Sequence, residues 1–270
     1  MAGPVLNAGR TLLMGILNVT PDSFSDGGQF SNVTDAFEQA RRMVEEGADI
    51  LDIGGESTRP GAKPVTEGEE LRRVMPLLER VCRELAVTIS VDTSKAAVAE
   101  ASLARGAKII NDVTGFRNPA MVEVAAAHRA ACIVMHMRGT PETMQSLTEY
   151  DDVVAEVKEF LAARVVVLRA AGIEEIAIDP GLGFAKTAAH NFALLRRLPE
   201  LVEIGAPVVV GPSRKRFLAT LADMEPMENR RDGTVAAITA AVLGGARIIR
   251  AHDMAQARRA IAVAEAVLQS

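Results

Sequence analysis

Short, continuously apolar runs recur along the chain, separated by longer segments in which apolar residues repeat at helical spacing. The short runs are rich in β-branched residues and predict strands at residues 12–17, 50–53, 88–91, 108–110, 132–135, 176–178, 208–210 and 247–249. Because these runs are apolar throughout rather than alternating, we expect parallel strands that are covered on both faces.

Amphipathic helices are predicted between the strands. Four apolar faces support them: Val33, Phe37, Ala40 and Val44; Leu71, Val74, Leu78, Val81 and Leu85; Val154, Val157, Leu161, Val165 and Leu168; and Ile261, Ala264, Val267 and Leu268. Pro76 falls inside the second of these helices. Since proline removes a helical hydrogen bond, we expect it to kink or split that helix.

This order of elements predicts the fold. Eight strands alternating with helices, about 30 residues per unit, indicate an α/β protein of the (β/α)8 TIM-barrel type. We expect a single domain over residues 1–270, with residues 1–10 as a short N-terminal extension. The alternative is a doubly wound sheet, which usually carries a G-x-G-x-x-G fingerprint after its first strand. This sequence has no such fingerprint.

Composition narrows the class of protein. The net charge is −5 and no basic stripe is visible, which argues against a nucleic-acid partner. Tryptophan is absent and there is a single tyrosine, too little aromatic surface for a platform that stacks sugars or single strands. Only Cys82 and Cys132 are present, both in apolar stretches, which favours a reducing compartment. The apolar runs are far shorter than the ~20 residues of a membrane span, so we expect a cytoplasmic protein without a membrane partner.

Polar residues close every predicted strand. They are Asn18, Asp52, Asp92, Asn111 with Asp112, His136, Asp179, Ser213 with Lys215, and Arg250 with His252. Any one of them could be only a turn former or a helix cap. In a TIM barrel, however, catalytic residues lie at the C-terminal ends of the strands. The set therefore predicts a site that combines carboxylates, amides and cations, suited to a heterocycle and an anion.

Two loops after the first strands add to this site. Residues 18–28 form a loop too long for a plain turn, and its two glycines suit a mobile lid. Residues 54–61, followed by Lys63, offer two hydroxyls and the guanidinium of Arg59, a combination that fits phosphate. Arg214 and Arg216 are interpreted as solvated surface charges.

Eight ordered motifs resemble those of the dihydropteroate synthase family. They are GILNVTPDSFSDGG at 15–28, DIGGESTRPG at 52–61, VDTS at 91–94, INDV at 110–113, MHMRGT at 135–140, DPGLGFAK at 179–186, GPSRK at 211–215 and RAH at 250–252. The resemblance covers residues 11–269. Ala251 departs from it, because a bulkier aliphatic residue is expected between the arginine and the histidine.

The resemblance implies a transferase of folate biosynthesis and a sulfonamide target. Its reaction joins (7,8-dihydropterin-6-yl)methyl diphosphate to 4-aminobenzoate and releases diphosphate. The implied pterin-binding residues are Asp92, Asn111, Asp179, Met135, Phe184, Gly211, Lys215 and Arg250. The implied diphosphate-binding residues are Asn18, Thr58, Arg59, Arg250 and His252, and those for 4-aminobenzoate are Phe24, Pro60 and Ser213. Among these, Asn18, Arg59, Lys215, Arg250 and His252 are the catalytic candidates.

The resemblance also implies Mg²⁺, with Asn18 as its ligand, dissociative loss of diphosphate, and a homodimer through the late helices at 234–243 and 255–268. Asp52 is expected to support the site rather than touch substrate, and His136 is left open between packing and the site. Whether Asp22, Asp26 and Glu56 reach the metal or the diphosphate is also left open.

Two other functions remain: a pterin-binding methyltransferase barrel, which would need no diphosphate-binding residues, and a catalytically silent homologue, which would lack one of the site residues.

Overall fold

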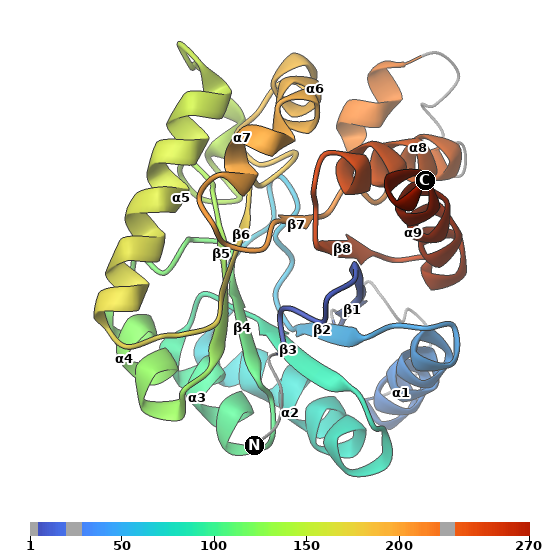
Figure 1. Cartoon of the computed structure of the whole chain (residues 1–270). Helices are drawn as coiled ribbons and strands as arrows, with labels where there is room; N and C mark the ends of the chain where they lie inside the picture. Colours follow the sequence, from blue (N-terminus) through green and yellow to red (C-terminus); the bar gives the residue numbers. More distant parts are fainter. Residues whose placement is uncertain (1–4, 20–28, 222–229) are drawn as a thin grey trace.

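The computed structural model describes residues 5–19, 29–221 and 230–270. It shows parallel strands at the centre with helices around them (Figure 1). The strands are β1 Leu12–Asn18, β2 Ile50–Gly54, β3 Thr88–Asp92, β4 Ile109–Asp112, β5 Ala131–Met135, β6 Ile176–Asp179, β7 Val209–Val210 and β8 Ile248–Ala251. The α-helices are α1 Gln29–Glu45, α2 Glu67–Glu84, α3 Ala96–Ala104, α4 Pro119–His128, α5 Val153–Ala170, α6 Ala188–Arg196, α7 Leu198–Val202, α8 Arg230–Leu243 and α9 Met254–Gln269, and short 3₁₀ turns lie at Met144–Ser146 and Arg216–Thr220.

The sheet closes on itself. Its eight strands follow the order β6-β5-β4-β3-β2-β1-β8-β7, and every pair is parallel. The two ends of this order meet where Ile178 pairs with Val208 and the Ile178 N–H donates to Pro207 O at 2.9 Å. A doubly wound sheet would keep two free edges, so the predicted single-domain (β/α)8 barrel is confirmed.

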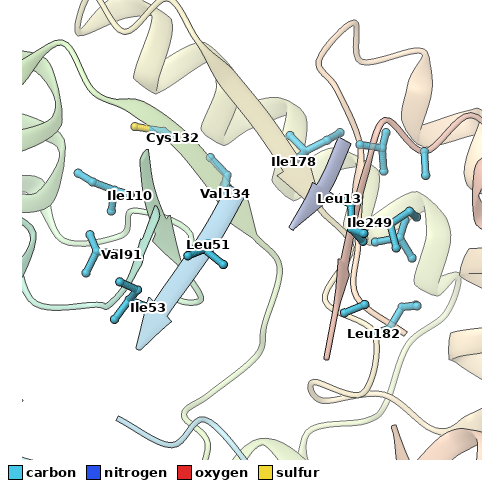
Figure 2. Close-up of a cluster of buried hydrophobic side chains, with 14 of the residues drawn as sticks. Leu13, Leu51, Ile53, Val91, Ile110, Cys132, Val134, Ile178, Leu182 and Ile249 are labelled. Atoms are coloured by element: carbon cyan, nitrogen blue, oxygen red, sulfur yellow. The ribbon is translucent and has the colours of Figure 1, made fainter. Parts of the chain in front are cut away.

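Alternation of side chains along the strands creates two apolar layers. One set points outward and packs against the helices, including Leu13, Leu51, Ile53, Val91, Ile110, Cys132, Val134, Ile178 and Ile249 (Figure 2). The other set fills the lower half of the barrel interior: Leu12, Met14, Ile50, Ile109, Ala131, Ile133, Ala177, Val209 and Ile248. Because side chains repeat every second residue, Asp52, Asn111, Asp179 and Arg250 lie on the same inward face as Ile50, Ile109, Ala177 and Ile248, one layer higher.

One strand boundary differs from the prediction in a way that matters for the site. Arg250 lies inside β8 rather than after it, so the predicted end of this strand at residue 249 was wrong. Asp52 lies in the middle of β2, inside the predicted strand at 50–53 and before the end of the strand. An apolar run stops where the inward face becomes polar, whereas backbone pairing continues for one or two more residues.

Two helices bear on the predictions. Helix α2 runs unbroken through Pro76, so the proline does not split it. Pro76 is exposed, and water can reach the carbonyl that the proline leaves without a helical partner. On α9, Ile261 and Ala264 are buried as predicted, but Val267 and Leu268 are each 58% exposed. No helix in the described part of the chain is long and apolar enough to cross a membrane.

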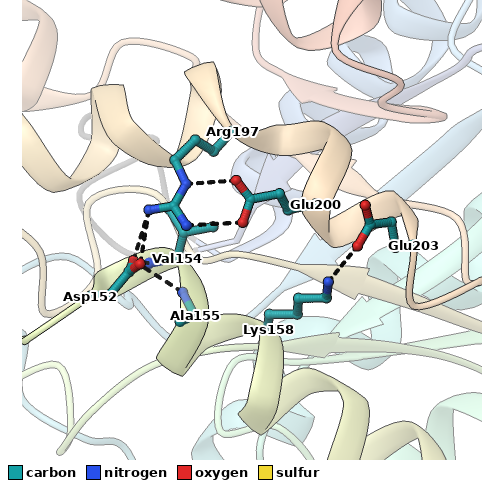
Figure 3. Close-up of polar contacts among 7 residues, drawn as sticks. All are labelled: Asp152, Val154, Ala155, Lys158, Arg197, Glu200 and Glu203. Atoms are coloured by element: carbon teal, nitrogen blue, oxygen red, sulfur yellow. Dashed lines mark hydrogen bonds and ion pairs between the residues drawn. The ribbon is translucent and has the colours of Figure 1, made fainter.

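Helices α5 and α7 are joined at the surface by a chain of ion pairs (Figure 3). Asp152 caps α5 and accepts a hydrogen bond of 2.9 Å from Arg197, which also pairs with Glu200 at 2.7 Å. Lys158 pairs with Glu203 at 2.6 Å. Exposed pairs of this kind contribute little to the stability of the fold.

The first described residues close the lower end of the barrel. Leu6 is 2% exposed and packs against the interior layer, and the backbone N–H groups of Val5 and Leu6 donate to Glu175 Oε2 at 2.7 and 3.1 Å. This part of the predicted N-terminal extension is therefore integrated into the core.

We expect Leu6→Ala to lower the free energy of unfolding by about 2–4 kcal/mol, the usual cost of a cavity at a fully buried leucine. Urea denaturation measures this. Val5→Ala is the matched control and should cost less, since Val5 is only half-buried. A loss below about 1 kcal/mol in Leu6→Ala would show that these residues do not close the core.

Candidate active site

Arg250 holds the centre of the site. Its Nε donates to Asp52 Oδ2 at 2.7 Å and its Nη2 donates to Asp92 Oδ2 at 2.8 Å. Asn111 Nδ2 donates to the same Asp52 oxygen at 3.0 Å. These four residues, the Arg250 cluster, come from β8, β2, β3 and β4, and the register that pairs Asp92 with Asn111 brings two of them together. The cluster thus spans one half of the upper barrel.

Charge balance in this cluster depends on Arg250. Asp52 is fully buried, and its Oδ1 has no hydrogen-bond partner among the described residues. Burial raises the pKa of Asp92 to about 7, although Arg250 acts in the opposite direction. The structure places Asp52 beneath the site, where it orients both Arg250 and Asn111.

Asp179 and Lys215 occupy the other half of the upper barrel. Asp179 ends β6 and accepts a hydrogen bond of 2.7 Å from the Gly181 N–H through Oδ1. Burial raises the pKa of Asp179, and the Lys215 ammonium partly opposes this. Burial also lowers the pKa of Lys215 to about 8. The Lys215 Nζ donates to Leu182 O and lies 4.7 Å from the centroid of the Phe184 ring.

The β6–α6 loop passes very close to the end of β5. A Cβ atom on Gly181, whose φ is +68°, would lie 2.0 Å from His136 O, so only glycine fits there. Met135, 4% exposed, is beside Gly181, and Met135 and the half-buried Phe184 belong to one small apolar cluster. The pterin candidates of β5 and β6 are thus brought together.

Ser213 and His252 form a hydrogen-bonded pair beside the cluster. The distance from Ser213 Oγ to His252 Nδ1 is 3.0 Å, and the His252 backbone N–H donates to Ser213 Oγ at 3.2 Å. Burial, together with Arg214, Arg250 and Arg59, lowers the pKa of His252 to about 3. His252 is therefore a neutral hydrogen-bonding group at physiological pH.

The β2–α2 loop borders a pocket at the mouth of the barrel. The lining residues are Glu56, Thr58, Glu70, Asp92, Thr93, Ser94, Lys95, Val113, Thr114 and Pro141. Lys95 Nζ bonds to Glu56 Oε2 at 2.5 Å and to the buried Glu70 at 2.6 Å, which ties this loop to α2 and α3. Arg59 and Pro60 are exposed on the loop.

The remaining candidates lie at the edges of the site. Asn18 is half-buried at the end of β1. Gly54 keeps open the space between Asn18 and Asp92. A Cβ atom on Gly54 would lie 3.5 Å from Asn18 Oδ1 and 3.3 Å from Asp92 Cβ. Gly211 is buried just after β7. Phe24, Asp22 and Asp26 lie outside the described residues.

Arg214 pairs with Asp253 at 2.7 Å and is therefore not the solvated charge that was predicted.

Sequence reasoning gave no role to Lys186, although it ends a quoted motif. Lys186 is 5% exposed, and its Nζ lies 3.0 Å from His136 Nδ1 and 2.9 Å from Phe184 O. Burial lowers the pKa of Lys186 to about 7 and that of His136 to about 2. The His136 ring packs edge-on against Phe160 at 5.1 Å. This arrangement gives His136 a packing role that joins the loops after β5 and β6.

Comparison with known proteins agrees with this geometry. Residues 14–252 match a family model described as "Pterin binding enzyme". A dihydropteroate synthase of Synechocystis sp. is 48% identical over 96% of this chain and 90% of its own length. The structure of Xanthomonas albilineans dihydropteroate synthase with 4-aminobenzoic acid superposes with a TM-score of 0.91 at 47% identity, covering 97% of this chain and 94% of that one. The Yersinia pestis dihydropteroate synthase, in a complex with a sulfonamide drug, gives 0.90 at 44% identity, covering 97% and 95%.

The chain is a pterin-binding enzyme of the TIM-barrel class, as defined by the closed barrel with its polar upper layer and by the family match over residues 14–252. Both the curated relative and the solved structures carry one name over nearly the whole chain. The chain belongs to the dihydropteroate synthase family, which consists of transferases of folate biosynthesis that are targets of sulfonamides.

Proposed function

We propose that the chain condenses (7,8-dihydropterin-6-yl)methyl diphosphate with 4-aminobenzoate to give 7,8-dihydropteroate and diphosphate. The observation that carries this proposal is the inward layer formed by Asp92, Asn111, Asp179, Lys215 and Arg250 at the C-terminal end of the barrel. It combines acceptors, amide groups and two cations, the set of partners that a pterin diphosphate needs.

The pterin is recognised along its hydrogen-bonding edge. Asp179 accepts from the 2-amino group and N3, Asn111 offers both a donor and an acceptor, and Lys215 donates to the pterin carbonyl or a ring nitrogen. The guanidinium of Arg250, held in place by Asp52 and Asp92, stacks on one face of the ring. The opposite face meets Met135, and Asp92, Phe184 and Gly211 complete the pocket.

The diphosphate and the aminobenzoate occupy the outer part of the site. Asn18, Thr58, Arg59, Arg250 and His252 bind the diphosphate, with the two arginines supplying the charge. Arg59 is near enough to His252 to lower the pKa of the imidazole, which supports a shared role for these two residues. Phe24, Pro60 and Ser213 bind the 4-aminobenzoate, with Ser213 or a backbone N–H receiving its carboxylate.

The residues present fit one Mg²⁺ ion. No group of three His, Cys, Asp or Glu side chains able to hold a metal occurs in the described ranges. Mg²⁺ commonly uses few protein ligands, and substrate phosphates and water complete its coordination. The amide oxygen of Asn18, half-buried at the end of β1, suits such a site. When bound, the ion neutralises charge on the leaving diphosphate.

Catalysis then follows from stabilising the leaving group. Arg250 and Arg59 face the charge that develops on the diphosphate, so breakage of the C–O bond runs ahead of attack by the amine. The electron-rich pterin stabilises the positive carbon that is left. The aromatic amine is already neutral at pH 7 and needs no strong base, so the protein positions it through its carboxylate.

The proposed reaction is tested with the purified full chain, Mg²⁺ and both substrates. We expect dihydropteroate and diphosphate to form in equal amounts. A methyltransferase barrel would consume no aminobenzoate, and a silent homologue would bind the pterin diphosphate without releasing diphosphate. Either result would overturn the proposal.

We expect turnover to depend on the metal. Removal of divalent ions with excess chelator should lower kcat about 10²-fold or more, because each preorganised charge at a leaving group contributes on this scale. Restoring Mg²⁺ should recover the activity, and Asn18→Ala should raise the Mg²⁺ concentration needed for half-maximal rate. Full turnover in chelator would remove Mg²⁺ from the mechanism.

We propose a homodimer through α8 and α9, which lie side by side (Figure 1). Leu243 at the end of α8 and Val263, Val267 and Leu268 on α9 are between 43% and 61% exposed. Light scattering after size exclusion should give twice the chain mass of 28.7 kDa. Val267→Asp should shift the mass toward one chain, and a wild-type monomer would contradict the proposal.

We also propose a cytoplasmic location. Cys82 and Cys132 are both free thiols, a state that a reducing compartment maintains. Fractionation of the source cells tests this directly.

A further inference from the structure

Lys95 joins two carboxylates that come from different segments of the chain. Its Nζ donates to Glu56 Oε2 at 2.5 Å and to Glu70 Oε2 at 2.6 Å. Glu56 lies on the β2–α2 loop, Glu70 in the first turn of α2, and Lys95 directly before α3. Burial lowers the pKa of Lys95, but the hydrogen bonds to the two carboxylates outweigh it and raise this pKa above its usual value. Lys95 is therefore a charged donor in this group of three residues, the Lys95 triad.

The Lys95 triad is less exposed than the ion pairs that join α5 and α7. The side chain of Glu70 is 0% exposed, and those of Glu56 and Lys95 are 17% and 18% exposed. Beside it, Arg73 Nη1 donates to Gly55 O at 3.0 Å, and a Cβ atom on Gly55 would lie 3.0 Å from Glu70 Cγ. The start of the β2–α2 loop thus packs directly against α2, at a place where water screens charge weakly.

Glu56 also closes the base of the β2–α2 loop. Its Oε2 accepts the backbone N–H of Val65 at 3.0 Å, and Val65 directly precedes the N-cap of α2. At the tip of the loop, the Gly61 N–H donates to Pro141 O, on the loop after β5, at 3.1 Å. Residues 58–60, which bind the diphosphate and the aminobenzoate in the proposed function, lie between these two attachments.

We propose that Lys95 is a positioning residue that holds residues 58–60 at the mouth of the barrel through Glu56. This rests on the proposed function for what the loop binds. An ammonium has three hydrogens to donate, and two of those on Lys95 are used by Glu56 and Glu70. Lys95 therefore acts through its partners. A loop that is already in place loses less conformational entropy when a substrate binds.

A direct electrostatic role is a different interpretation of Lys95, because Lys95, Thr58 and Asp92 line the same pocket. The two interpretations predict opposite effects for Glu56. If only charge mattered, removal of the Glu56 carboxylate would strengthen the binding of an anion, and removal of the Lys95 ammonium would weaken it. If Lys95 positions the loop, either removal breaks the same link, and both weaken binding.

Amide hydrogen exchange of the ligand-free full chain tests the link itself. Lys95→Met and Glu56→Leu both break it, and Glu56→Leu keeps the bond between Lys95 and the buried Glu70. We expect residues 57–66 to exchange about 10-fold faster in both variants, since a hydrogen bond to a charged group is lost. Glu56→Gln, which keeps an acceptor oxygen, should lie between wild type and Glu56→Leu. Lys158→Met is the matched control, because it breaks an exposed ion pair and should leave residues 57–66 unchanged.

Two exchange results would contradict the positioning role: unchanged exchange of residues 57–66 in Glu56→Leu, or faster exchange of the whole chain in that variant. The second result would mean that Glu56 supports the fold in general. If Lys95→Met does not fold, Lys95→Met combined with Glu70→Gln takes its place, because the added substitution removes the charge that is left without a partner.

Calorimetry with Mg²⁺ and inorganic diphosphate tests the consequence for binding. We expect about 10-fold weaker binding in Lys95→Met and in Glu56→Leu, and no further loss when both are combined, because the two residues form one link. The affinity for a pterin that lacks the diphosphate should not change, since the proposed pterin-binding residues lie outside this loop.

Tighter diphosphate binding in Glu56→Leu would show that only charge matters. Weaker binding in Glu56→Leu alone, with Lys95→Met unaffected, would make Glu56 a ligand of the metal. Either result would overturn the proposal. If wild type binds no diphosphate, the proposed function fails, whereas the exchange result still stands.

Discussion

Replacing Arg250 by methionine is expected to lower kcat/KM about 10³-fold, because one preorganised charge at the leaving group is lost together with the contact to the pterin face. The same change leaves Asp52 and Asp92 without their buried partner. Removing one member of a buried ion pair usually costs about 3–5 kcal/mol of stability. Steady-state assays and urea denaturation measure the two effects on the same preparation.

The two effects are separable with a second substitution. Arg250→Met combined with Asp52→Asn removes one uncompensated charge, so we expect it to recover much of the stability and none of the activity. Recovery of turnover in the double variant would show that Arg250 acts only through folding.

The pH dependence of stability gives a further check on Arg250. Burial raises the pKa of Asp92 above its unfolded value, to about 7. The protonated form of Asp92 therefore stabilises the folded state. This contribution to the free energy of unfolding is fully present below pH 3.8, the unfolded pKa, and is lost as the pH rises through about 7. Without Arg250 this pKa rises further, so the stability deficit of Arg250→Met should be larger at pH 8 than at pH 6.

The barrel itself could be predicted from the sequence because its signal is local. Each strand is an apolar run covered on both faces, and each helix has its own apolar face. The boundaries could not be predicted as well. The polar Arg250 continues the pairing of β8 beyond the predicted end at residue 249, since backbone hydrogen bonds do not depend on side-chain polarity. Val267 and Leu268 have the right helical spacing, but they lie in the last turn of α9 and are exposed.

The identity of the site residues could also be predicted, but not their partners. A polar residue near each strand end is visible in the sequence, whereas the bonds from Arg250 to Asp52 and Asp92 join residues more than 150 positions apart. The pairing of Lys186 with His136 depends on how closely one loop passes another. Arg214 was interpreted as solvated for the same reason, because its partner Asp253 lies on a different loop.

Replacing Asp179 by asparagine is expected to weaken pterin binding roughly 100-fold. The carboxylate accepts from two N–H groups of the pterin, whereas the amide would direct its own N–H₂ group at one of them. An unmet buried donor costs about 1–3 kcal/mol, and each 1.4 kcal/mol is a factor of ten in affinity. Titration calorimetry with a pterin that lacks the diphosphate isolates this contact.

The same substitution should not destabilise the unliganded protein. Burial raises the pKa of Asp179, so its stabilising protonated form is fully present below the unfolded pKa and is lost as the pH rises through the folded pKa. Above the folded pKa of Asp179 the ionised carboxylate is a cost that asparagine removes, although Lys215 then loses an opposite charge and its pKa falls further below about 8.

Asp112→Asn is the matched control for Asp179→Asn. Asp112 is a buried carboxylate at the end of β4, but its oxygens accept from Thr114 and the Phe116 N–H instead of facing the interior of the barrel. We expect this variant to lose stability and to keep the pterin affinity of its folded fraction. We expect the opposite pattern in Asp179→Asn: weaker pterin binding in a protein that is at least as stable above the folded pKa of Asp179. That pattern would identify a carboxylate that is kept for its ligand at the expense of folding. Unchanged pterin affinity in Asp179→Asn would place the recognition of the 2-amino group elsewhere in the barrel.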